Sequence, residues 1–243
     1  QYDSVAGLQR DVGTRLLDFL DRPAEAPRAV LDLGCGTGFF QAGLAGHYPG
    51  ARYIGLDLAQ GMVDFARGRD AGAGEWLVGD AEALPLAGES VDRVFSSLAV
   101  QWCYRPDHLF AELARILRPG GRCVFSTLGP DTLHELRGAW AAVDDHRHVN
   151  RFLPAADLAA AAGSLPGLRL RLETERYCMY YQRVGELLSE LKTLGAHNMN
   201  RDRPSGLTSR RALQGMLRAY EVRRCDGVLP ATYEVIFGVL EKA

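Results

Sequence analysis

The sequence predicts an α/β fold, with a mostly parallel sheet of seven strands and a helical lid inserted between the last two strands. Two observations indicate the sheet. Five apolar segments alternate with helix-like segments over about 100 residues, which is the order that right-handed parallel crossovers require. The first of these segments ends in a glycine-rich turn. Because 47% of the 243 residues are hydrophobic, one domain with an inserted cap is favoured over two independent domains.

The first strand is expected at residues 29–33, an apolar run interrupted by one aspartate. Glycines 34, 36 and 38 follow it, and they allow the backbone to turn sharply and to approach a ligand where any Cβ would collide. A nucleotide-like ligand is therefore expected across this turn. Cys35 lies inside the turn, where a small residue that fills the site is a simpler interpretation than a nucleophile.

The spacing of the turn discriminates between cofactors. A dinucleotide-binding turn would have its third glycine at Phe39, whereas this chain has it at Gly38. Asp32 stands just before the turn, and its carboxylate would repel a pyrophosphate but attract the cationic amino-acid end of S-adenosylmethionine, directly or through water. The pattern therefore favours S-adenosylmethionine over NAD.

The next two strands end in carboxylates. The second strand is expected at 52–58 and carries Asp57, which lies 21 residues beyond Gly36. An acid at this offset suits the paired ribose hydroxyls of an adenosine. The third strand is expected at 75–79 and is followed by Asp80. Ligands of such sheets lie in the crevice outside the carboxyl ends of the strands, so both acids are expected there.

The fourth strand is expected at 90–98, and the residues at and after its end are candidates for the reacting site. Leu98, Gln101 and Trp102 would lie at the carboxyl edge of the sheet, beside the bound cofactor. The core then continues with a helix at 109–117, a turn at 118–122 and a fifth strand at 123–127.

Beyond residue 128 the pattern is no longer that of a minimal sheet. The expected elements are helices at 131–145 and 154–162, a sixth strand at 168–181, helices at 184–194 and 210–220, and a final strand at 232–240. Roughly 50 residues separate the last two strands, which is too long for a simple connection and is expected to form the lid. The single domain of 1–243 thus comprises a cofactor-binding core at 1–128, substrate-side helices at 129–165 and a lid at 182–226.

Composition excludes several classes of protein. No apolar run approaches the ~18 to 20 residues that a membrane span needs. The five cysteines form no C-x-x-C pair, and an odd number cannot pair completely, so a reducing cytoplasm is expected. The spacing of cysteine and histidine indicates no metal site.

Motifs along the whole chain resemble one family. The D-x-G-x-G-x-G turn resembles motif I of class I S-adenosylmethionine-dependent methyltransferases. Six further segments resemble the malonyl-[acyl-carrier protein] O-methyltransferases of biotin synthesis, the BioC family: 2–6, 97–103, 125–128, 148–152, 191–198 and 232–236. The resemblance implies a Rossmann-like sheet whose last strand is inserted antiparallel, and a segment at 79–85 that contacts adenine. It also implies methylation of the free carboxylate of a malonyl thioester, on acyl carrier protein or coenzyme A, so that fatty-acid enzymes can extend it to the pimeloyl chain.

The turn, the strand ends and the resemblance together predict the residues that bind the cofactor. They are Tyr2, Asp32, Gly34, Cys35, Gly36, Gly38, Asp57, Leu58, Met62, Asp80, Ala81, Leu98 and Gln101. Tyr2 is included because a Tyr-Asp pair before the first long helix often folds over the cofactor in this superfamily; an ordinary packing role is the alternative.

A malonyl carboxylate is ionised at pH 7 and is its own nucleophile, so no general base is required. The reaction instead needs groups that position the carboxylate about 3 Å from the methyl carbon and exclude water. The candidates for this catalytic role are Gln101, Tyr2, His148, Lys192 and His197, with Trp102, Asn150 and Asn198 as substrate-binding residues and Arg147 and Arg151 as cationic alternatives. Structural histidines, a solvated lysine, packing by the tryptophan and turn or cap roles for the asparagines are the simpler alternatives.

A basic segment indicates the partner. Residues 201–224 contain seven arginines against one aspartate and one glutamate, a local charge of +5 in a chain of net charge −2. Acyl carrier proteins are acidic and their prosthetic arm carries a phosphate, so arginines would steer them to the site. The carrier-binding candidates are Arg201, Arg203, Arg210, Arg211 and Arg218. The alternative is a helix merely solvated by arginines; nucleic acid and membrane partners are not expected.

Three other functions remain open. The first is methylation of another small acceptor, such as a quinone carbon or an aconitate-like acid. The second is a regulator that binds S-adenosylmethionine without catalysis, for which an intact turn at 32–38 would suffice. The third is an NAD oxidoreductase, which Phe39 and Asp32 disfavour.

Overall fold

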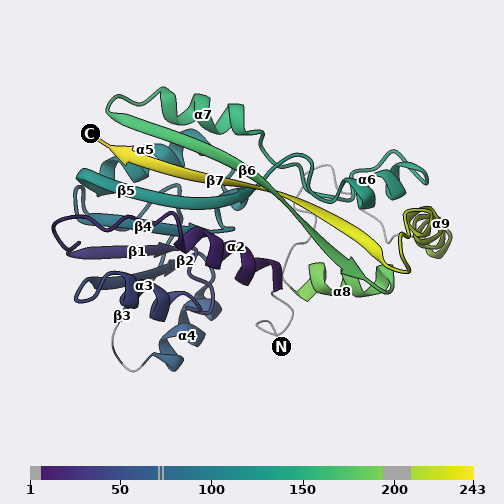
Figure 1. Cartoon of the computed structure of the whole chain (residues 1–243), viewed down its shortest axis with the longest axis horizontal. Helices are drawn as coiled ribbons and strands as arrows, with labels where there is room; N and C mark the ends of the chain where they lie inside the picture. The colour runs from purple at the N-terminus through teal and green to yellow at the C-terminus, as the bar shows by residue number, and fades with distance from the viewer. Residues whose placement is uncertain (1–6, 71, 73, 194–208) are drawn as a thin grey trace. The chain divides into compact units, whose positions relative to one another are not determined.

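The computed structural model describes residues 7–70, 72, 74–193 and 209–243 (Figure 1). The seven strands form one sheet in the order β3-β2-β1-β4-β5-β7-β6. The first five strands of this order pair in parallel, and Figure 1 draws β6 and β7 with their arrows in opposite directions. The mostly parallel, seven-stranded sheet that the sequence predicts is thereby confirmed.

The chain divides into two compact units, each of which is described by itself. The sheet unit comprises residues 11–127, 154–174 and 236–243, and the outer unit comprises residues 1–10, 128–153 and 175–235. The division of the single domain into core, substrate-side helices and lid stays a prediction.

The centre of the sheet unit is β1 (Ala29–Leu33), in which every residue is buried. It pairs with β2 (Arg52–Asp57) on one side and with β4 (Val91–Ser97) on the other. The sheet continues through β3 (Gly74–Val78) beyond β2 and through β5 (Leu117–Leu128) beyond β4. A strand that is buried on both faces needs a nearly continuous apolar sequence, which is what the run at 29–33 provides.

The fifth strand begins earlier than the sequence predicts. Residues 118–122, expected to form a separate turn, are part of β5, and Val91 of β4 already pairs with Leu117. The register then shifts between Val91 and Arg93, so the Pro-Gly-Gly run is absorbed as an irregularity of the strand. A bulge of this kind and a tight turn share the same glycine signature, which explains the difference.

Helices flank these strands in the sheet unit. They are α3 (Gln41–His47), α4 (Gln60–Arg69), the short η1 (Val100–Trp102), α5 (Pro106–Ile116) and α7 (Ala155–Gly163). The helix α2 (Gly7–Leu17) contributes residues to both units. The helix α5 begins with a proline, whose fixed φ suits the first turn, and it buries four apolar side chains spaced three and four residues apart. It packs on α7, whereas α4 packs on β2 and β3.

The outer unit contains three helices among its described residues: α6 (His134–Ala141), α8 (Val184–Thr193) and α9 (Arg210–Glu221). Both α6 and α8 contact α9. The long strands β6 (Leu168–Tyr181) and β7 (Leu229–Lys242) contribute residues to both units. No helix within the described ranges is long and apolar enough to cross a membrane.

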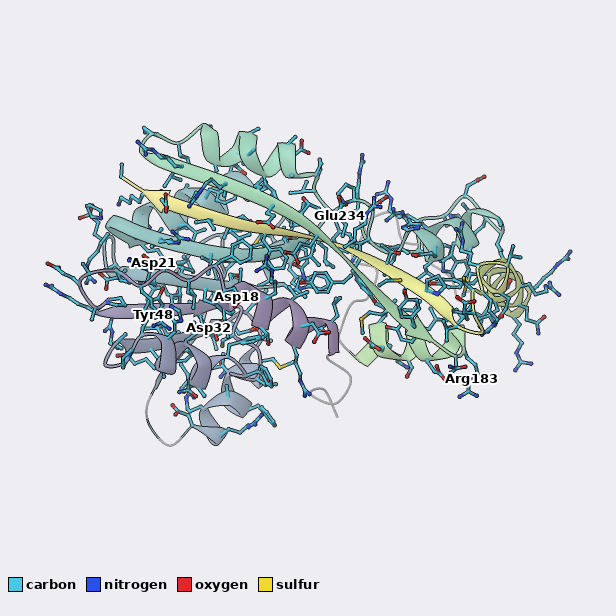
Figure 2. All side chains as sticks on the ribbon, viewed as in Figure 1. Asp18, Asp21, Asp32, Tyr48, Arg183 and Glu234 are labelled. Atoms are coloured by element: carbon cyan, nitrogen blue, oxygen red, sulfur yellow. The ribbon has the colours of Figure 1, made fainter. Side chains whose placement is uncertain are left out.

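A buried ion pair ties the connection before β1 to β4. Arg93 is 8% exposed and donates two hydrogen bonds of 2.8 Å to the carboxylate of Asp21. Tyr48 donates a further bond of 3.0 Å to Oδ1 of Asp21 (Figure 2). Burial alone would raise the pKa of Asp21, but the hydrogen bonds from Arg93 and Tyr48 outweigh it and lower that pKa. This contribution to stability is present above the unfolded-state pKa and is lost as the pH falls through the folded-state pKa.

Close packing between β5 and β7 leads to a first prediction. A Cβ on Gly238 would overlap the ring of Phe125, which is fully buried and cannot give way. We expect Gly238→Ala to destabilise the protein by about 1 to 3 kcal/mol, measured by urea denaturation. Gly46→Ala is the matched control, because a Cβ there meets nothing within 4 Å inside a helix. That control should be neutral or more stable by up to about 1 kcal/mol, and equal destabilisation by both variants would contradict the packing argument.

Candidate functional site

The turn after β1 is held against the end of β2. The backbone amides of Gly34 and Cys35 both donate to the carbonyl oxygen of Leu56, at 2.7 and 3.0 Å, and the amide of Gly38 donates to Cys35 at 2.9 Å. The three glycines have φ values of 75°, 52° and 73°, in the left-handed region that side chains other than glycine rarely adopt. The turn is therefore a fixed shape between β1 and α3.

The three glycines are required for different reasons. A Cβ on Gly34 would overlap Ala99, and a Cβ on Gly38 would lie 2.6 Å from the indole of Trp76. A Cβ on Gly36 would meet nothing within 4 Å. The outer glycines thus permit packing of the protein against itself, whereas the middle one faces open space into which a ligand can come.

Asp57 braces this turn. Its carboxylate accepts hydrogen bonds from the amide of Gly36 at 2.9 Å and from the amide of Ala59 at 2.8 Å. Each carboxylate oxygen can accept a second bond, so ribose hydroxyls can still bind. The fold therefore brings Asp57 to the glycine turn. Its part in binding the ribose hydroxyls stays a prediction.

Asp32 is buried beneath the same turn. It is 2% exposed, lies between Gly55 of β2 and Phe95 of β4, and accepts a hydrogen bond of 2.8 Å from the hydroxyl of Tyr53 (Figure 2). Burial and the nearby Asp57 raise the pKa of Asp32 to about 7 in spite of that hydrogen bond. Because the folded state then holds a proton that the unfolded state has lost, this acid costs stability as the pH rises from about 4 to about 7.

The segment after β4 lies beside the glycine turn, since Ala99 fills the space next to Gly34. Leu98 has a left-handed φ of 49°, and its amide donates to Ser126 of β5. The side-chain amide nitrogen of Gln101 donates to the carbonyl of Leu98 at 2.6 Å, but its Oε1 is buried without a hydrogen-bond partner among the described residues. A buried acceptor of this kind needs a donor, which a bound ligand can supply.

The other predicted cofactor residues follow β2 and β3. Leu58 is 71% exposed and Val78, which pairs with Asp57, is 41% exposed, so apolar surface lies beside the bracing carboxylate. Met62 is half-buried, and Asp80 accepts a bond of 2.9 Å from the amide of Glu82, which fixes the local turn. Ala81 is half-buried beside it. Apolar surface next to a carboxylate suits an adenosine.

Cys35 is buried, and burial followed by the charges of Asp32 and Asp57 raises the pKa of its thiol. A thiol that stays protonated is a poor nucleophile, which agrees with a small residue filling the turn. All five cysteines are free thiols.

In the outer unit, His148 is held by two neighbours. Its ring stacks on Trp140 with a centroid distance of 3.7 Å, and its Nε2 lies 2.8 Å from Oδ1 of Asp144. Burial would raise the pKa of Asp144, but hydrogen bonds from His148 and the amide of His146 lower it. The histidine is therefore fixed in orientation, as either a structural or a functional role requires. Asn150 is half-buried, and Lys192 is exposed on α8.

The basic segment is partly described. Arg210, Arg211 and Arg218 are exposed on α9, and within the described part of the chain none of them forms an ion pair at salt-bridge distance. Arg224, in contrast, pairs with Glu221 at 2.7 Å and donates to the carbonyl of Gln182. Five predicted residues lie outside the described ranges: Tyr2, His197, Asn198, Arg201 and Arg203.

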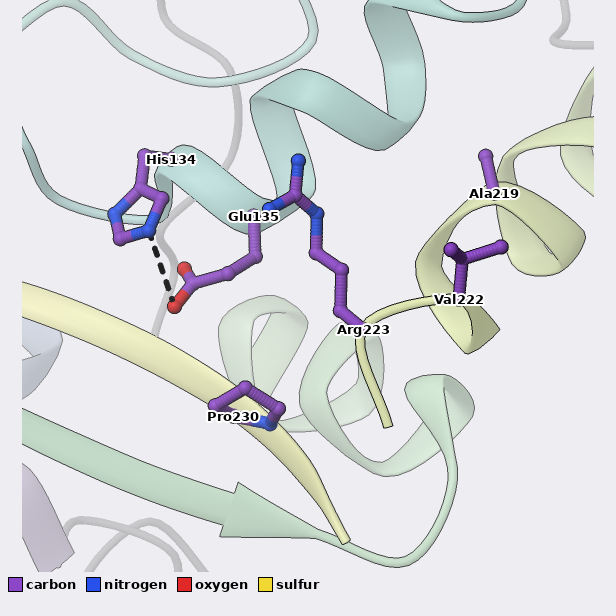
Figure 3. Close-up of a pocket in the computed structure, with 6 residues that line it drawn as sticks. All are labelled: His134, Glu135, Ala219, Val222, Arg223 and Pro230. Carbon is purple, nitrogen blue, oxygen red and sulfur yellow. Dashed lines mark ion pairs between the residues drawn. The ribbon is translucent and has the colours of Figure 1, made fainter. Parts of the chain in front are cut away.

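One pocket contains none of the candidate catalytic or binding residues, although Arg223 of the basic segment lines it. It has a volume of about 600 Å³ and lies in the outer unit (Figure 3), lined by His134, Glu135, Ala219, Val222, Arg223 and Pro230. Glu135 is 3% exposed and accepts hydrogen bonds from the amide and the hydroxyl of Thr232, and the ring of His134 lies 3.5 Å from it. The acid thus fastens α6 to β7.

Sequence reasoning also missed Tyr53 and Trp76, which support Asp32, an acid predicted to bind the cofactor. The indole of Trp76 donates to Asp70 at 2.8 Å and meets the ring of Tyr53 edge-on at 5.4 Å. It occupies the space that a Cβ on Gly55 would need, at 2.5 Å. The signal was available in β2, where a glycine stands two residues after a tyrosine in a buried strand, a pattern that indicates close approach of another side chain.

Comparison with known proteins identifies the kind of domain that carries these residues. A family model described as a methyltransferase domain matches residues 31–125. The chain is 43% identical to a malonyl-[acyl-carrier protein] O-methyltransferase of Methylococcus capsulatus, over 99% of this chain and 89% of that protein. It is 51% identical to the biotin biosynthesis bifunctional protein BioHC of Cellvibrio japonicus over 99% of this chain, but spans only 47% of that longer protein.

Solved structures agree on the fold. The YcgJ protein from Bacillus subtilis has a TM-score of 0.66 at 18% identity, covering 96% of this chain and 98% of that one. A geranyl diphosphate C-methyltransferase from Streptomyces coelicolor, solved with S-adenosylhomocysteine, has a TM-score of 0.57 at 16% identity, covering 97% and 80%. At these identities the likeness shows the fold alone.

The open space at Gly36 leads to a second prediction. We expect Gly36→Ala to weaken the affinity for S-adenosylmethionine by at least about tenfold, because its methyl group would occupy the space in which the ligand lies. Gly50→Ala is the matched control, since Gly50 also has a positive φ, of 83°, and open surroundings but lies in a distant turn. Calorimetric titration should show unchanged affinity for the control, and equal affinities for both variants would exclude a ligand at Gly36.

Proposed function

The chain belongs to the malonyl-[acyl-carrier protein] O-methyltransferase family, and from this membership we propose that it methylates the free carboxylate of a malonyl thioester with S-adenosylmethionine. The product is the malonyl methyl ester that primes the pimeloyl chain of biotin. The observation that carries the proposal is the 43% identity over almost the whole of this chain and 89% of a curated relative of that name. Identity over this length includes the segments outside the cofactor core.

The residues of the sheet unit fit the cofactor. A buried acid without a cationic partner among the described residues suits a cation, and the open face at Gly36 accepts a ligand close to the backbone. We assign Asp32, Asp57 and the glycine turn to S-adenosylmethionine, with Leu58 and Val78 against its adenine. When bound, the cofactor supplies an electrophilic sulfonium methyl group, and S-adenosylhomocysteine is left when the C–S bond breaks as the C–O bond forms.

The work of the chain in this reaction is to position the acceptor. The carboxylate oxygen carries its own lone pair, so no residue needs to remove a proton. Gln101 is a candidate on the sheet unit for holding the cofactor beside that acceptor, because its Oε1 is buried without a partner among the described residues, beside the glycine turn, and can accept a hydrogen bond from an amino group of the ligand. We propose that it orients the ligand at that point and that the surrounding apolar side chains exclude water.

The outer unit supplies the other candidates. Asp144 and Trp140 hold the ring of His148 in one orientation, and its part in binding the substrate carboxylate stays a proposal. Lys192 is exposed on α8 and offers a cation. The roles of Tyr2, Asn150, His197 and Asn198 stay predictions of the resemblance.

The carrier protein is proposed to dock on α9. Arg210, Arg211 and Arg218 share one face of the helix, since residues three, four, seven and eight apart lie on the same side. Arginines without an ion pair of their own are available for an acidic partner, and rim charges of this kind mainly raise the rate of encounter. A cytoplasmic location and the acceptance of malonyl-coenzyme A are parts of the same proposal.

Methyl transfer tests the function directly. With radiolabelled S-adenosylmethionine, malonyl carrier protein should be labelled, and the label should be removed by mild base as expected of an ester. Acetyl carrier protein, which lacks the free carboxylate, is the matched control and should stay unlabelled. Cofactor binding without label on the malonyl form would contradict the substrate assignment while leaving the cofactor site intact.

Docking on α9 makes a further prediction. The double change Arg211→Glu and Arg218→Glu should lower kcat/KM for malonyl carrier protein on the order of tenfold or more, because it replaces attraction to an acidic partner by repulsion. Turnover of a small malonyl thioester without protein should stay within about twofold of wild type. Arg169→Glu, at an exposed position of β6, is the control and should leave both substrates unaffected. Equal loss on both substrates would refute docking at this helix.

A further inference from the structure

The cofactor acid has no counter-ion in the part of the chain that the structure describes. The influences on the charge of Asp32 are its burial, the hydroxyl of Tyr53 and the negative charge of Asp57, and no Arg, Lys or His is among them. Buried carboxylates in proteins are normally paired with a cation. Asp21, in the same unit, shows the usual arrangement with Arg93 at 2.8 Å. The one donor that the sheet unit gives to Asp32 is therefore a phenol.

The side chain of Tyr53 is held in place by packing against Trp76. Tyr53 is 5% exposed, and the Trp76 ring meets it edge-on. Asp70 in turn accepts hydrogen bonds from the indole of Trp76 and from the amide of Gly74, both at 2.8 Å. The series Asp70, Trp76, Tyr53 and Asp32 thus runs from the C-terminal end of α4 through β3 and β2 to β1. A donor held in this way fixes both the orientation and the charge of the acid that it contacts.

The titratable side chains of Tyr53 and Cys35, next to Asp32, do not change their protonation state near neutral pH. Burial, followed by the charge of Asp32, raises the pKa of Tyr53, so its hydroxyl stays protonated. Burial and the two neighbouring carboxylates raise the pKa of Cys35, so its thiol stays neutral. The facing residue on β4 is Phe95, which carries no charge. Asp32, with a pKa of about 7, is the group that titrates.

We infer that Tyr53 is a positioning residue for cofactor binding: its hydrogen bond to Asp32 favours the ionised carboxylate, which serves as the counter-charge of a cationic ligand. Loss of the hydroxyl favours the protonated acid further, so the ligand must expel a larger fraction of a proton when it binds near neutral pH. The inference rests on the cofactor of the proposed function and is independent of the acceptor.

The test compares two tyrosine variants in the absence of any acceptor. Tyr53→Phe removes the hydroxyl at Asp32, and Tyr48→Phe is the matched control, since it removes a buried hydroxyl from Asp21, which keeps Arg93 as its partner. The affinity for S-adenosylmethionine is measured by equilibrium dialysis between pH 6 and 9. Dividing the wild-type affinity by that of each variant at the same pH cancels the titration of the ligand itself.

One hydrogen bond to an ionised acid typically changes its ionisation equilibrium by about tenfold. The midpoint of the pH dependence of affinity should therefore move up by about one pH unit in Tyr53→Phe. The ratio of wild-type to Tyr53→Phe affinity should then fall from about tenfold at pH 6 to about fivefold at pH 7 and to near unity at pH 9. A variant that had merely lost packing would instead show the same ratio at every pH. The ratio for Tyr48→Phe should not change with pH.

Asp32→Asn provides a second variant, because an amide cannot titrate. The affinity of Asp32→Asn for S-adenosylmethionine, divided by that of Tyr53→Phe, should decrease as the pH rises, because Asp32 ionises in Tyr53→Phe only. Circular dichroism is used to confirm that Asp32→Asn is folded. A pH-independent ratio for Tyr53→Phe, or the same pH-dependent ratio for Tyr48→Phe, would overturn the inference. Failure of the wild-type protein to bind S-adenosylmethionine would refute the proposed function instead, so the two failures are distinguishable.

Discussion

The structure of the site depends on one constraint: a carboxylate on β1 is buried, and no cation among the described residues lies beside it. Asp32 lies between two neighbouring strands at 2% exposure, and Asp57 adds a second negative charge at the end of the next strand. Such an arrangement is unfavourable to the fold by itself. It becomes favourable when a cation is supplied at the carboxyl ends of the strands, which is where ligands of this class of sheet bind. The charge of the buried acid and the position of the strand ends therefore both favour a cationic ligand at this edge of the sheet.

Packing around the glycine turn fixes the groups that surround the buried acid. Gly34 and Gly38 let Ala99 and Trp76 come close, and Gly55 makes room for the same indole. These contacts fix the turn and the tyrosine below it, so that the amide of Gly36 and the two acids hold one geometry before a ligand arrives. Preorganised groups of this kind lower the cost of binding. The buried acid lowers the stability of the fold, and the site that contains it needs little rearrangement to bind a ligand.

The order of strands and the glycine turn could be predicted from the sequence because both are local patterns, an apolar run at 29–33 followed by three glycines. The partner of Asp32 could not, since Tyr53 is brought to it by the register of two strands rather than by sequence spacing. The bulged start of β5 looked like a turn because both conformations use Pro and Gly. The stacking of His148 on Trp140 likewise depends on the fold of a loop, and no periodic pattern encodes it.

The proton balance of cofactor binding reports on the buried carboxylate of Asp32. Calorimetric titration of the wild-type protein with S-adenosylmethionine at pH 6.5, in two buffers of different ionisation enthalpy, gives the number of protons exchanged. At this pH the amino group of the free ligand is already charged. With a pKa of about 7, Asp32 is mostly protonated before binding, so we expect the release of about three-quarters of a proton per ligand bound. Tight binding without proton release would contradict it.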